Sequence, residues 1–399
     1  MAIPPELQDT DPVNNAITTL NFQKGFKRLP DKIPSSPSSC HMAHYNFLAK
    51  DEGLSHILAR VITLPFQHGF SLIRWHTAVH FILEKEPENH LNTQAQSDTA
   101  PWNRHEFCIL PTVGKTTCAS CPCTKHNNPL PPNFGGRRGC KVHGALLLKT
   151  LSLDLIQYAC LNDIVFNNNT KACFGRIVSS KGLMATECLG MPTTTTICRL
   201  ATIQGTKFFI QTAHSVSPGF FTSTLSALIL GVLQGSRAVP WIWLSICGIL
   251  LHTLITHTTG FQAACPCYSK NSKHPWESFA DNTDLWLISN SHSPSRILVS
   301  SMQKVAQLWE CLSCASGGTM AIPKCFHYLV DWYWNHKGFP ILSSNTNSSD
   351  PQLVMTSGRS ILTNPIPKSK TTLGSALWEC VYLKMDLLEM SSHIASSKH

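Results

Sequence analysis

The side chains best suited to hold a metal ion gather between residues 118 and 126. Three cysteines and a histidine stand there, at Cys118, Cys121, Cys123 and His126. Thiolate and imidazole are the ligands of structural zinc, but this spacing matches neither a Cys2His2 finger nor a ribbon of two cysteine pairs. We therefore interpret the cluster as thiols in a loop.

A phosphate-binding loop is the next chemistry that the residues suggest. Gly114-Lys115-Thr116 ends as the GxxxxGK[ST] motif does, but the first glycine of that motif falls on Ile109. The loop is therefore not predicted. The 19 histidines are scattered, so chance pairs are common and no histidine-based catalytic group stands out.

Five blocks of sequence form an ordered set. They read FNNNTKACFGRIV (166–178), GVLQGSRAVPWIWL (231–244), FADNTDLW (279–286), GGTMAIPKCFHYLVDW (317–332) and TTLG (371–374). In this order and at these separations they resemble the palm motifs of reverse transcriptases from non-LTR, LINE-like retrotransposons. The second and fourth blocks are specific, whereas the third would be weak if it stood by itself.

Segments nearer the N-terminus extend the resemblance. Residues 35–45 (SSPSSCHMAHY) resemble the SPSGxHxGHY-type segment of the same family, and residues 134–139 resemble its FGxRPG turn. Residues 74–75 and 83–87 resemble its finger segment RW…EKxPG, so that the match covers residues 30 to 375. The match has a gap over residues 89–132, where the family's LRxI strand and the following helix are missing. That stretch is polar and aperiodic, and we expect it to be degraded or disordered.

The resemblance implies RNA-templated DNA synthesis by two-metal nucleotidyl transfer. Two Mg²⁺ ions about 4 Å apart would neutralise the charge on the attacking 3′ oxygen and on the leaving pyrophosphate. Magnesium takes hard oxygen ligands, in practice carboxylates. In the family, one Asp ends a strand of the first palm motif, and an adjacent pair lies in the hairpin of the third.

Most of the family's carboxylate positions are substituted in this chain. The two aspartates of the first motif stand as Asn169 and Gly175, and the adjacent pair of the third stands as Asp281 and Asn282. Asp281 is therefore the surviving carboxylate and the expected metal ligand. Because an amide cannot balance a divalent ion as a carboxylate does, we expect poor Mg²⁺ binding and no polymerase activity.

Other positions match the family better. The resemblance implies nucleotide or template binding by Gln234, Gly235, Ser236, Arg237, Phe279 and Lys324. Lys324 stands at the fourth-motif lysine, a candidate proton donor to pyrophosphate. Taken singly, each of these residues is explained as well by a turn, a solvated charge or a core side chain.

The elements that must position these residues are helices and strands of a mixed fold. Apolar spacing predicts helices over residues 57–70, 145–158, 176–189, 237–254 and 297–312, and strands near residues 73–83, 164–166 and 285–288. The resemblance implies an α+β right-hand polymerase fold with an antiparallel palm sheet packed on helices.

The resemblance also implies a division into domains. We expect an N-terminal arm over residues 1–40 with a Pro/Ser-rich end, a fingers-like region over residues 41–160, a palm over residues 161–375 and a tail over residues 376–399. The tail is too short for a helical bundle, so we expect the thumb to be truncated or absent.

Composition agrees with a folded chain that has few charges. The 399 residues are 43% hydrophobic, which excludes a disordered or collagen-like protein, but only 14% charged, where about 25% is usual. Lys and Arg number 32 against 23 Asp and Glu, a net charge of +9. Together with the resemblance, this charge implies an RNA template and DNA primer, or an RNA/DNA hybrid, as partners.

The sequence predicts an intracellular protein, in the cytoplasm or the nucleus. The N-terminus lacks the basic start and apolar run that are typical of a signal peptide. The 17 irregularly spaced cysteines favour reduced thiols over a set of disulfides. Residues 238–258 lack charged side chains and are long enough to cross a bilayer. Polar residues dilute this stretch, so we expect a buried core helix and no membrane contact.

Three interpretations stay open. The chain is a decayed reverse-transcriptase-like polypeptide without polymerase activity, a non-catalytic nucleic-acid-binding protein of the same fold, or a membrane protein that spans at residues 238–258. Only 11 of the 32 basic residues are Arg, whereas Cys, His and Trp are abundant. Single-base transitions turn Arg into Cys, His or Trp and Asp into Asn or Gly, which favours decay. Whether the chain is an enzyme, and its oligomeric state, are left open.

Overall fold

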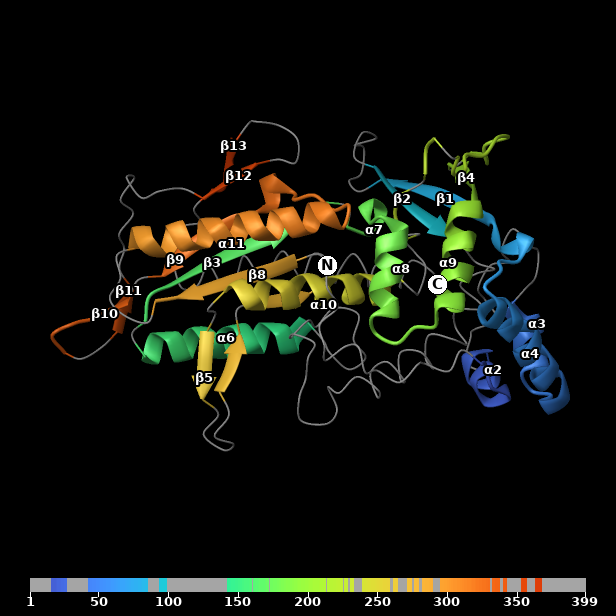
Figure 1. The fold of residues 1–399 in the computed structure, drawn as a ribbon, viewed down its shortest axis with the longest axis horizontal. Helices are drawn as coiled ribbons and strands as arrows, with labels where there is room; N and C mark the ends of the chain where they lie inside the picture. Colours follow the sequence, from blue (N-terminus) through green and yellow to red (C-terminus); the bar gives the residue numbers. More distant parts are fainter. Residues whose placement is uncertain are drawn as a thin grey trace. The chain divides into compact units, whose positions relative to one another are not determined.

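The structure is a computed structural model in which helices and strands alternate in an α+β fold (Figure 1). It describes residues 16–26, 42–84, 93–98, 142–159, 161–171, 173–212, 214–224, 226–228, 230–232, 239–258, 261–264, 271–274, 276–279, 282–289, 295–330, 332–337, 340–342, 353–356 and 363–367. The chain divides into two compact units, one of residues Met1–Leu130 and Ala172–Ile249, the other of residues Pro131–Lys171 and Leu250–His399.

The second unit is built on a four-stranded antiparallel sheet. Its strands run in the order β7 (Trp276–Phe279), β8 (Asn282–Ile288), β3 (Asp163–Asn169) and β9 (Phe326–Val330). The predicted strands at residues 164–166 and 285–288 are confirmed as parts of β3 and β8. Ile164, Val165 and Phe166 are all buried, because helices cover both faces of the sheet.

Those helices are α6 (Val142–Tyr158) and α11 (Ser295–Ala315), on opposite faces of the sheet (Figure 1). Ile156 of α6 packs into one cluster with Val165 of β3. Trp309 of α11 donates its indole N–H to Oδ1 of Asn168, at 2.8 Å. Since successive residues of a strand point to opposite faces, Val165 and Asn168 mark the two sides. Both helices were predicted from their apolar spacing.

Short hairpins complete the described part of this unit. They are β5 (Phe261–Ala264) with β6 (Asn271–His274), β10 (Trp332–Trp334) with β11 (Pro340–Leu342), and β12 (Val354–Thr356) with β13 (Thr363–Pro365). Gln303 of α11 holds β12 by its side-chain amide, which donates to the carbonyl of Val354 at 2.6 Å and accepts from its N–H at 2.7 Å.

The first unit has a three-stranded sheet, in which β1 (Thr77–Glu84) pairs antiparallel with β2 (Thr93–Asp98) and parallel with β4 (Lys207–Gln211). Its helices are α2 (Thr19–Phe26), α3 (Met42–Leu48), α4 (Glu52–His68), α7 (Cys173–Arg176), α8 (Ser179–Glu187) and α9 (Thr193–Gly205). One core cluster, formed by α2, α4 and α9, includes Phe22, Phe26, Phe66, Trp75 and Cys198. The predicted helix at residues 57–70 is therefore part of α4, and the strand at 73–83 is β1 preceded by a 3-10 turn, η1 (Ile73–Trp75).

Helix α10 (Val239–His257) covers most of the predicted helix at residues 237–254. Of the helices that the structure describes, it alone has the length and apolar composition to cross a membrane, with a mean hydropathy of 1.7 over its most apolar 18 residues. Of that window, 61% is buried within the protein. Ile242, Leu250 and Leu254 are among the buried side chains, which agrees with the expected core helix.

The helix expected over residues 176–189 is interrupted in the structure. Arg176 ends α7, and α8 begins at Ser179. The N–H of Gly231 donates to the carbonyl of Ile177 at 2.8 Å, and the hydroxyl of Ser179 donates to the carbonyl of Gly231 at 2.6 Å. At the break, residues 177 and 179 therefore form hydrogen bonds with Gly231, which is distant in sequence. Local periodicity does not reveal such contacts.

Several described elements were not expected, among them α9 and β2. Helix α9 opens with four threonines, whose β-branched side chains favour strands, yet Cys198 and Thr202 pack it into the core. Residues 93–98 form β2, although we expected no regular structure between residues 89 and 132. As an edge strand, β2 pairs through its backbone and needs no apolar pattern. The other residues of that stretch, with the cysteine cluster at 118–126, lie outside the described residues.

Candidate functional site

The third block forms a tight hairpin between β7 and β8. Phe279 pairs with Asn282 across the two strands, so that two residues, Ala280 and Asp281, connect them. Asp281, the expected metal ligand, lies outside the described residues. Phe279 is the last residue of β7, directly before this connection.

Asn169 and Asn282 are neighbours across the sheet. Asn169 is the last residue of β3, Asn282 is the first of β8, and the antiparallel register pairs them directly. Nδ2 of Asn169 donates a hydrogen bond to Oδ1 of Asn282 at 2.7 Å. These are two of the four positions that carry Asp in the family. They are 113 residues apart in sequence and are joined here by a hydrogen bond between side-chain amides.

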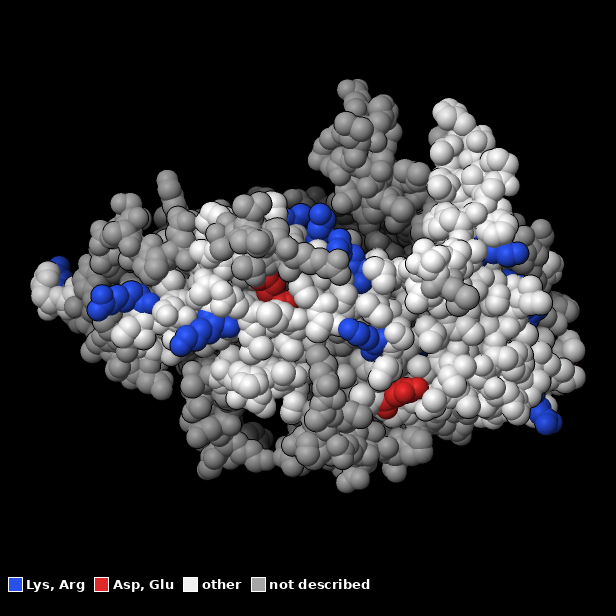
Figure 2. Space-filling model, turned by 45° about the horizontal axis from the view of Figure 1, so that its top comes forward, with Lys and Arg blue, Asp and Glu red and all other residues white. Residues whose placement is uncertain are grey.

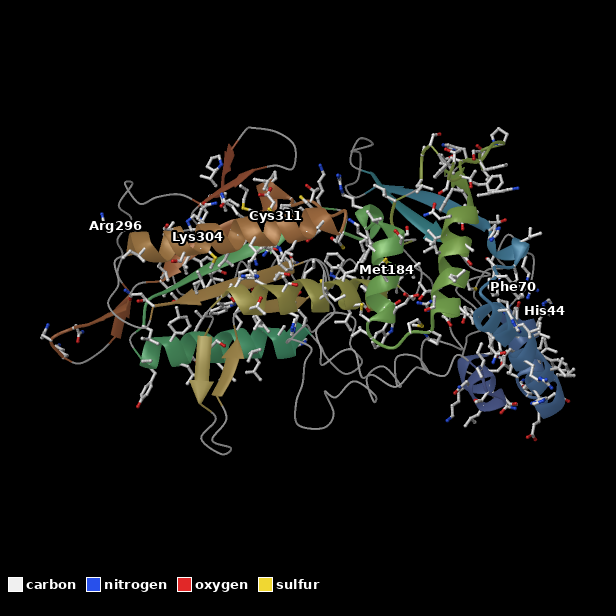
Figure 3. All side chains as sticks on the ribbon, viewed as in Figure 1. His44, Phe70, Met184, Arg296, Lys304 and Cys311 are labelled. Atoms are coloured by element: carbon white, nitrogen blue, oxygen red, sulfur yellow. The ribbon has the colours of Figure 1, made fainter. Side chains whose placement is uncertain are left out.

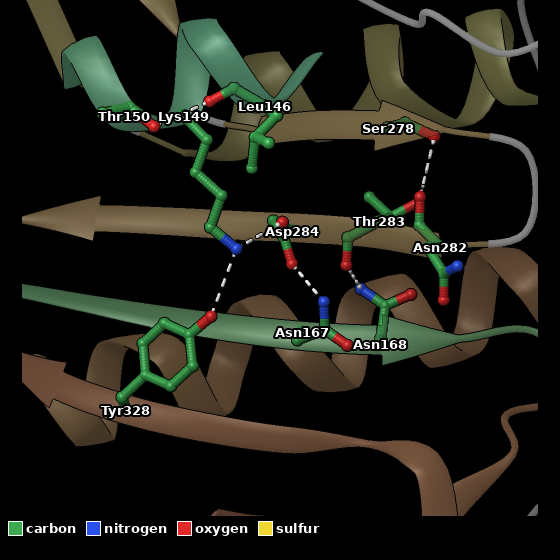
Figure 4. Close-up of polar contacts among 10 residues, drawn as sticks. All are labelled: Leu146, Lys149, Thr150, Asn167, Asn168, Ser278, Asn282, Thr283, Asp284 and Tyr328. Carbon is green, nitrogen blue, oxygen red and sulfur yellow. Dashed lines mark hydrogen bonds and ion pairs between the residues drawn. The ribbon is translucent and has the colours of Figure 1, made fainter. Parts of the chain in front are cut away.

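A buried ion pair lies on the same face of the sheet, one pleat further along (Figure 4). Nζ of Lys149, from α6, is 2.9 Å from Oδ2 of Asp284 and also donates to the hydroxyl of Tyr328 at 3.2 Å. Asn167 donates to Oδ1 of Asp284. The Lys149 and Asp284 side chains are 1% and 3% exposed.

Both oxygens of Asp284 are therefore engaged by donors from the interior. A buried carboxylate whose ammonium partner is within hydrogen-bonding distance is held firmly, since separating the pair would leave a charge in a low-dielectric environment. Although Asp284 is only two residues from Asn282, it cannot serve as a substitute metal ligand at the strand end without breaking this pair.

The described donors do not fit a pair of Mg²⁺ ions. Two facing carboxylates would repel each other unless cations lay between them. Asn169 and Asn282 instead satisfy each other as donor and acceptor and need no ion. Among the residues that the structure describes, no three His, Cys, Asp or Glu side chains gather closely enough to hold a metal ion.

The fourth block is bound to the end of β3. The N–H of Ala321 donates to the carbonyl of Asn169 at 2.8 Å, and the N–H of Lys171 donates to the carbonyl of Thr319, also at 2.8 Å. Lys324 ends the 3-10 turn η3 (Ile322–Lys324) that follows, and its side chain is exposed. The expected lysine thus lies close in sequence to a residue that contacts Asn169.

The cysteine after Lys324 has no accessible chemistry. Cys325 is buried, and its Sγ donates to the carbonyl of Ala321 at 3.4 Å. Burial raises the pKa of the Cys325 thiol to about 11, so it remains protonated at neutral pH. It is neither a nucleophile nor a thiolate ligand in this fold.

Gly175, the trailing first-motif position, belongs to α7 in the other unit. An added Cβ at Gly175 would meet no atom within 4 Å, so nothing requires a glycine there. Gly231, at the start of the second block, has φ +100°. It packs so closely that a Cβ added at Gly231 would lie 3.0 Å from Cα of Gly175. The second block therefore begins against the first. Gln234, Gly235, Ser236 and Arg237 lie outside the described residues.

Sequence reasoning missed the partners of Asp284. Lys149 is the single charge among the leucines of residues 146–153, and a lone Lys in an apolar stretch of helix was the available signal that it is buried and paired. Two further buried contacts were also missed: Tyr328 accepts from Lys149, and Trp309 donates to Asn168. Neither residue gave such a signal, because aromatic residues in core elements are ordinary.

No protein-family model matches the chain, and no curated protein matches it.

Proposed function

We propose that the chain is a reverse-transcriptase-like polypeptide of a retrotransposon whose palm no longer supports nucleotidyl transfer. The observation that carries this proposal is the pairing of Asn169 with Asn282 at the ends of β3 and β8, beside a two-residue hairpin connection. In the right-hand polymerase fold that the resemblance implies, these two positions carry metal-binding aspartates.

The convergence of the blocks supports the family assignment. Three blocks chosen by their motifs come together at one end of one antiparallel sheet. Asn169 ends strand β3, and Asn282 begins the neighbouring strand β8. The N–H of Ala321 donates a hydrogen bond to the carbonyl of Asn169. Residues brought together only by chance resemblance would have no reason to share a sheet end.

The charges of the residues at and near the family's metal-ligand positions argue against catalysis. Nucleotidyl transfer needs carboxylates that hold two cations against the transferred phosphate. Asn169 and Asn282 are neutral and bonded to each other, while Asp284 is bonded to Lys149. Asp281 is then the remaining carboxylate of the family set, and one monodentate ligand does not hold two Mg²⁺ ions.

Binding of RNA or of an RNA/DNA hybrid without chemistry is the second candidate. The net charge of +9 favours it, and Figure 2 shows Lys and Arg spread over the visible face with few Asp or Glu among them. The membrane alternative rests on α10 and is tested by carbonate extraction of the expressed chain: release into the soluble fraction would exclude it.

Primer extension on an RNA template tests the proposal. The natural chain is compared, with Mg²⁺ or Mn²⁺, with the triple reversion Asn169→Asp, Gly175→Asp and Asn282→Asp. We expect no DNA synthesis by the natural chain and measurable synthesis by the reversion. Robust synthesis by the natural chain would overturn the proposal.

A matched control separates restored ligands from added negative charge. Asn21→Asp, Gly219→Asp and Asn335→Asp introduce the same three carboxylates at positions outside the site, and an added Cβ at Gly219 meets no atom within 4 Å. This variant should remain inactive. If neither variant is active, the gap in the resemblance over residues 89–132 is a second defect, and the claim that the substitutions explain inactivity fails.

A further inference from the structure

Two cysteines share the exposed face of α11 at its last turn. Cys311 and Cys314 are three residues apart, and both are exposed (Figure 3 labels Cys311). Residues at this spacing are neighbours on a helix surface, with Cβ atoms about 5–6 Å apart. The helix backbone therefore presents two thiols side by side to solvent, far in sequence from the strand-end asparagines.

The spacing suits an ion that takes two sulfur ligands. A metal–thiolate bond is about 2.3 Å long, so a two-coordinate ion holds its sulfurs up to about 4.6 Å apart. Rotation about the Cα–Cβ bonds of Cys311 and Cys314 covers that span. Soft thiolates select Cu(I), whereas structural Zn²⁺ requires four ligands. No further His, Cys, Asp or Glu completes a larger set among the described residues.

We propose that Cys311 and Cys314 form a two-thiolate site for Cu(I). Two S–H bonds break and two S–Cu bonds form. Two protons pass to solvent, copper stays in the +1 state, and the bound site carries one net negative charge. The site uses none of the residues that the resemblance assigns to metal or nucleotide binding, so it is independent of the proposed function.

Alkylation of the full-length chain measures this site despite the other cysteines. Trypsin releases residues 305–324 as one peptide whose only cysteines are Cys311 and Cys314. The native chain is treated anaerobically with a maleimide, with and without buffered Cu(I), and then digested for mass spectrometry. With free Cu(I) at ten times the dissociation constant, we expect alkylation of this peptide to slow about tenfold, because only the unliganded fraction reacts.

Two controls make the spacing the tested variable. The peptide of residues 182–199 carries the half-buried Cys188 and the buried Cys198, ten residues apart, so alkylation of Cys188 should not respond to Cu(I). The variant Gln307→Cys with Cys311→Ser keeps two exposed thiols on the same helix face but places them two turns apart, about 10 Å. We expect protection to be lost in that variant. Equal protection of the variant, no protection of the natural peptide, or equal protection by Zn²⁺ would overturn the proposal.

Discussion

Nζ of Lys149 and Oδ2 of Asp284 lie 2.9 Å apart in the interior of the second unit, where α6 crosses the sheet. Asn167 and Tyr328 complete the hydrogen bonds of the pair. This contact joins residues 135 positions apart. It anchors α6 to β8 and keeps the carboxylate nearest to Asn282 away from the strand end.

Removal of the ammonium group should destabilise the protein strongly. Lys149→Met leaves the buried Asp284 carboxylate without its counter-charge, which typically costs about 3–5 kcal/mol of unfolding free energy. Urea denaturation measures the loss. The double variant Lys149→Met with Asp284→Asn removes both charges and should recover most of the stability. A single variant as stable as the natural chain would contradict the buried pair.

Restored carboxylates should make stability depend on divalent metal. In the variant Asn169→Asp with Asn282→Asp, two carboxylates replace the amide–amide bond, so repulsion should lower the melting temperature at neutral pH. Mg²⁺ or Mn²⁺ binds only the folded form of such a site and should raise the melting temperature again. The natural chain should not respond. Equal metal response of both chains by thermal denaturation would argue against a metal site at this strand end.

Gly182 should tolerate no larger side chain. An added Cβ at Gly182 would lie 2.8 Å from Cγ2 of Ile242 and 3.1 Å from Cγ2 of Ile177. Gly182→Ala should therefore cost about 1–3 kcal/mol of unfolding free energy through overpacking. Gly175→Ala is the matched control, since no atom lies within 4 Å of its Cβ and its stability should be unchanged or slightly higher. Equal melting temperatures for the two variants would refute this packing.

Acidification should weaken the first unit through His76. Burial, and secondarily the nearby Lys207, lower the pKa of His76 below its ordinary value of 6.5, and Nε2 lies 2.8 Å from Oγ of Ser71. The unfolded chain then binds more protons as pH falls below about 6.5, so unfolding becomes easier on acidification. Denaturant titrations at pH 7 and pH 5 should show a smaller difference for His76→Gln than for the natural chain. An equal difference for His76→Gln and for the natural chain would contradict this role of His76.

Four elements of the second unit, two helices and two strands of its central sheet, were predictable from local pattern. Apolar spacing predicted α6 and α11, and the continuous apolar runs predicted β3 and β8, because burial of one or both faces of an element imposes a periodicity on its sequence. Elements without such a pattern were missed. The threonines of α9 disguise a helix, and β2 pairs by its backbone at a sheet edge.

In the candidate site, too, local features could be predicted and tertiary contacts could not. The sequence by itself determined which residue types stand at the motif positions, and hence that Asn169, Gly175 and Asn282 lack carboxylates. Only the tertiary structure decided that Asn169 forms a hydrogen bond with Asn282 and that Lys149 forms an ion pair with Asp284. Strand register and helix packing bring together residues that are more than a hundred positions apart in sequence. Side-chain chemistry is local to a residue, whereas the partner that satisfies it is chosen by the fold.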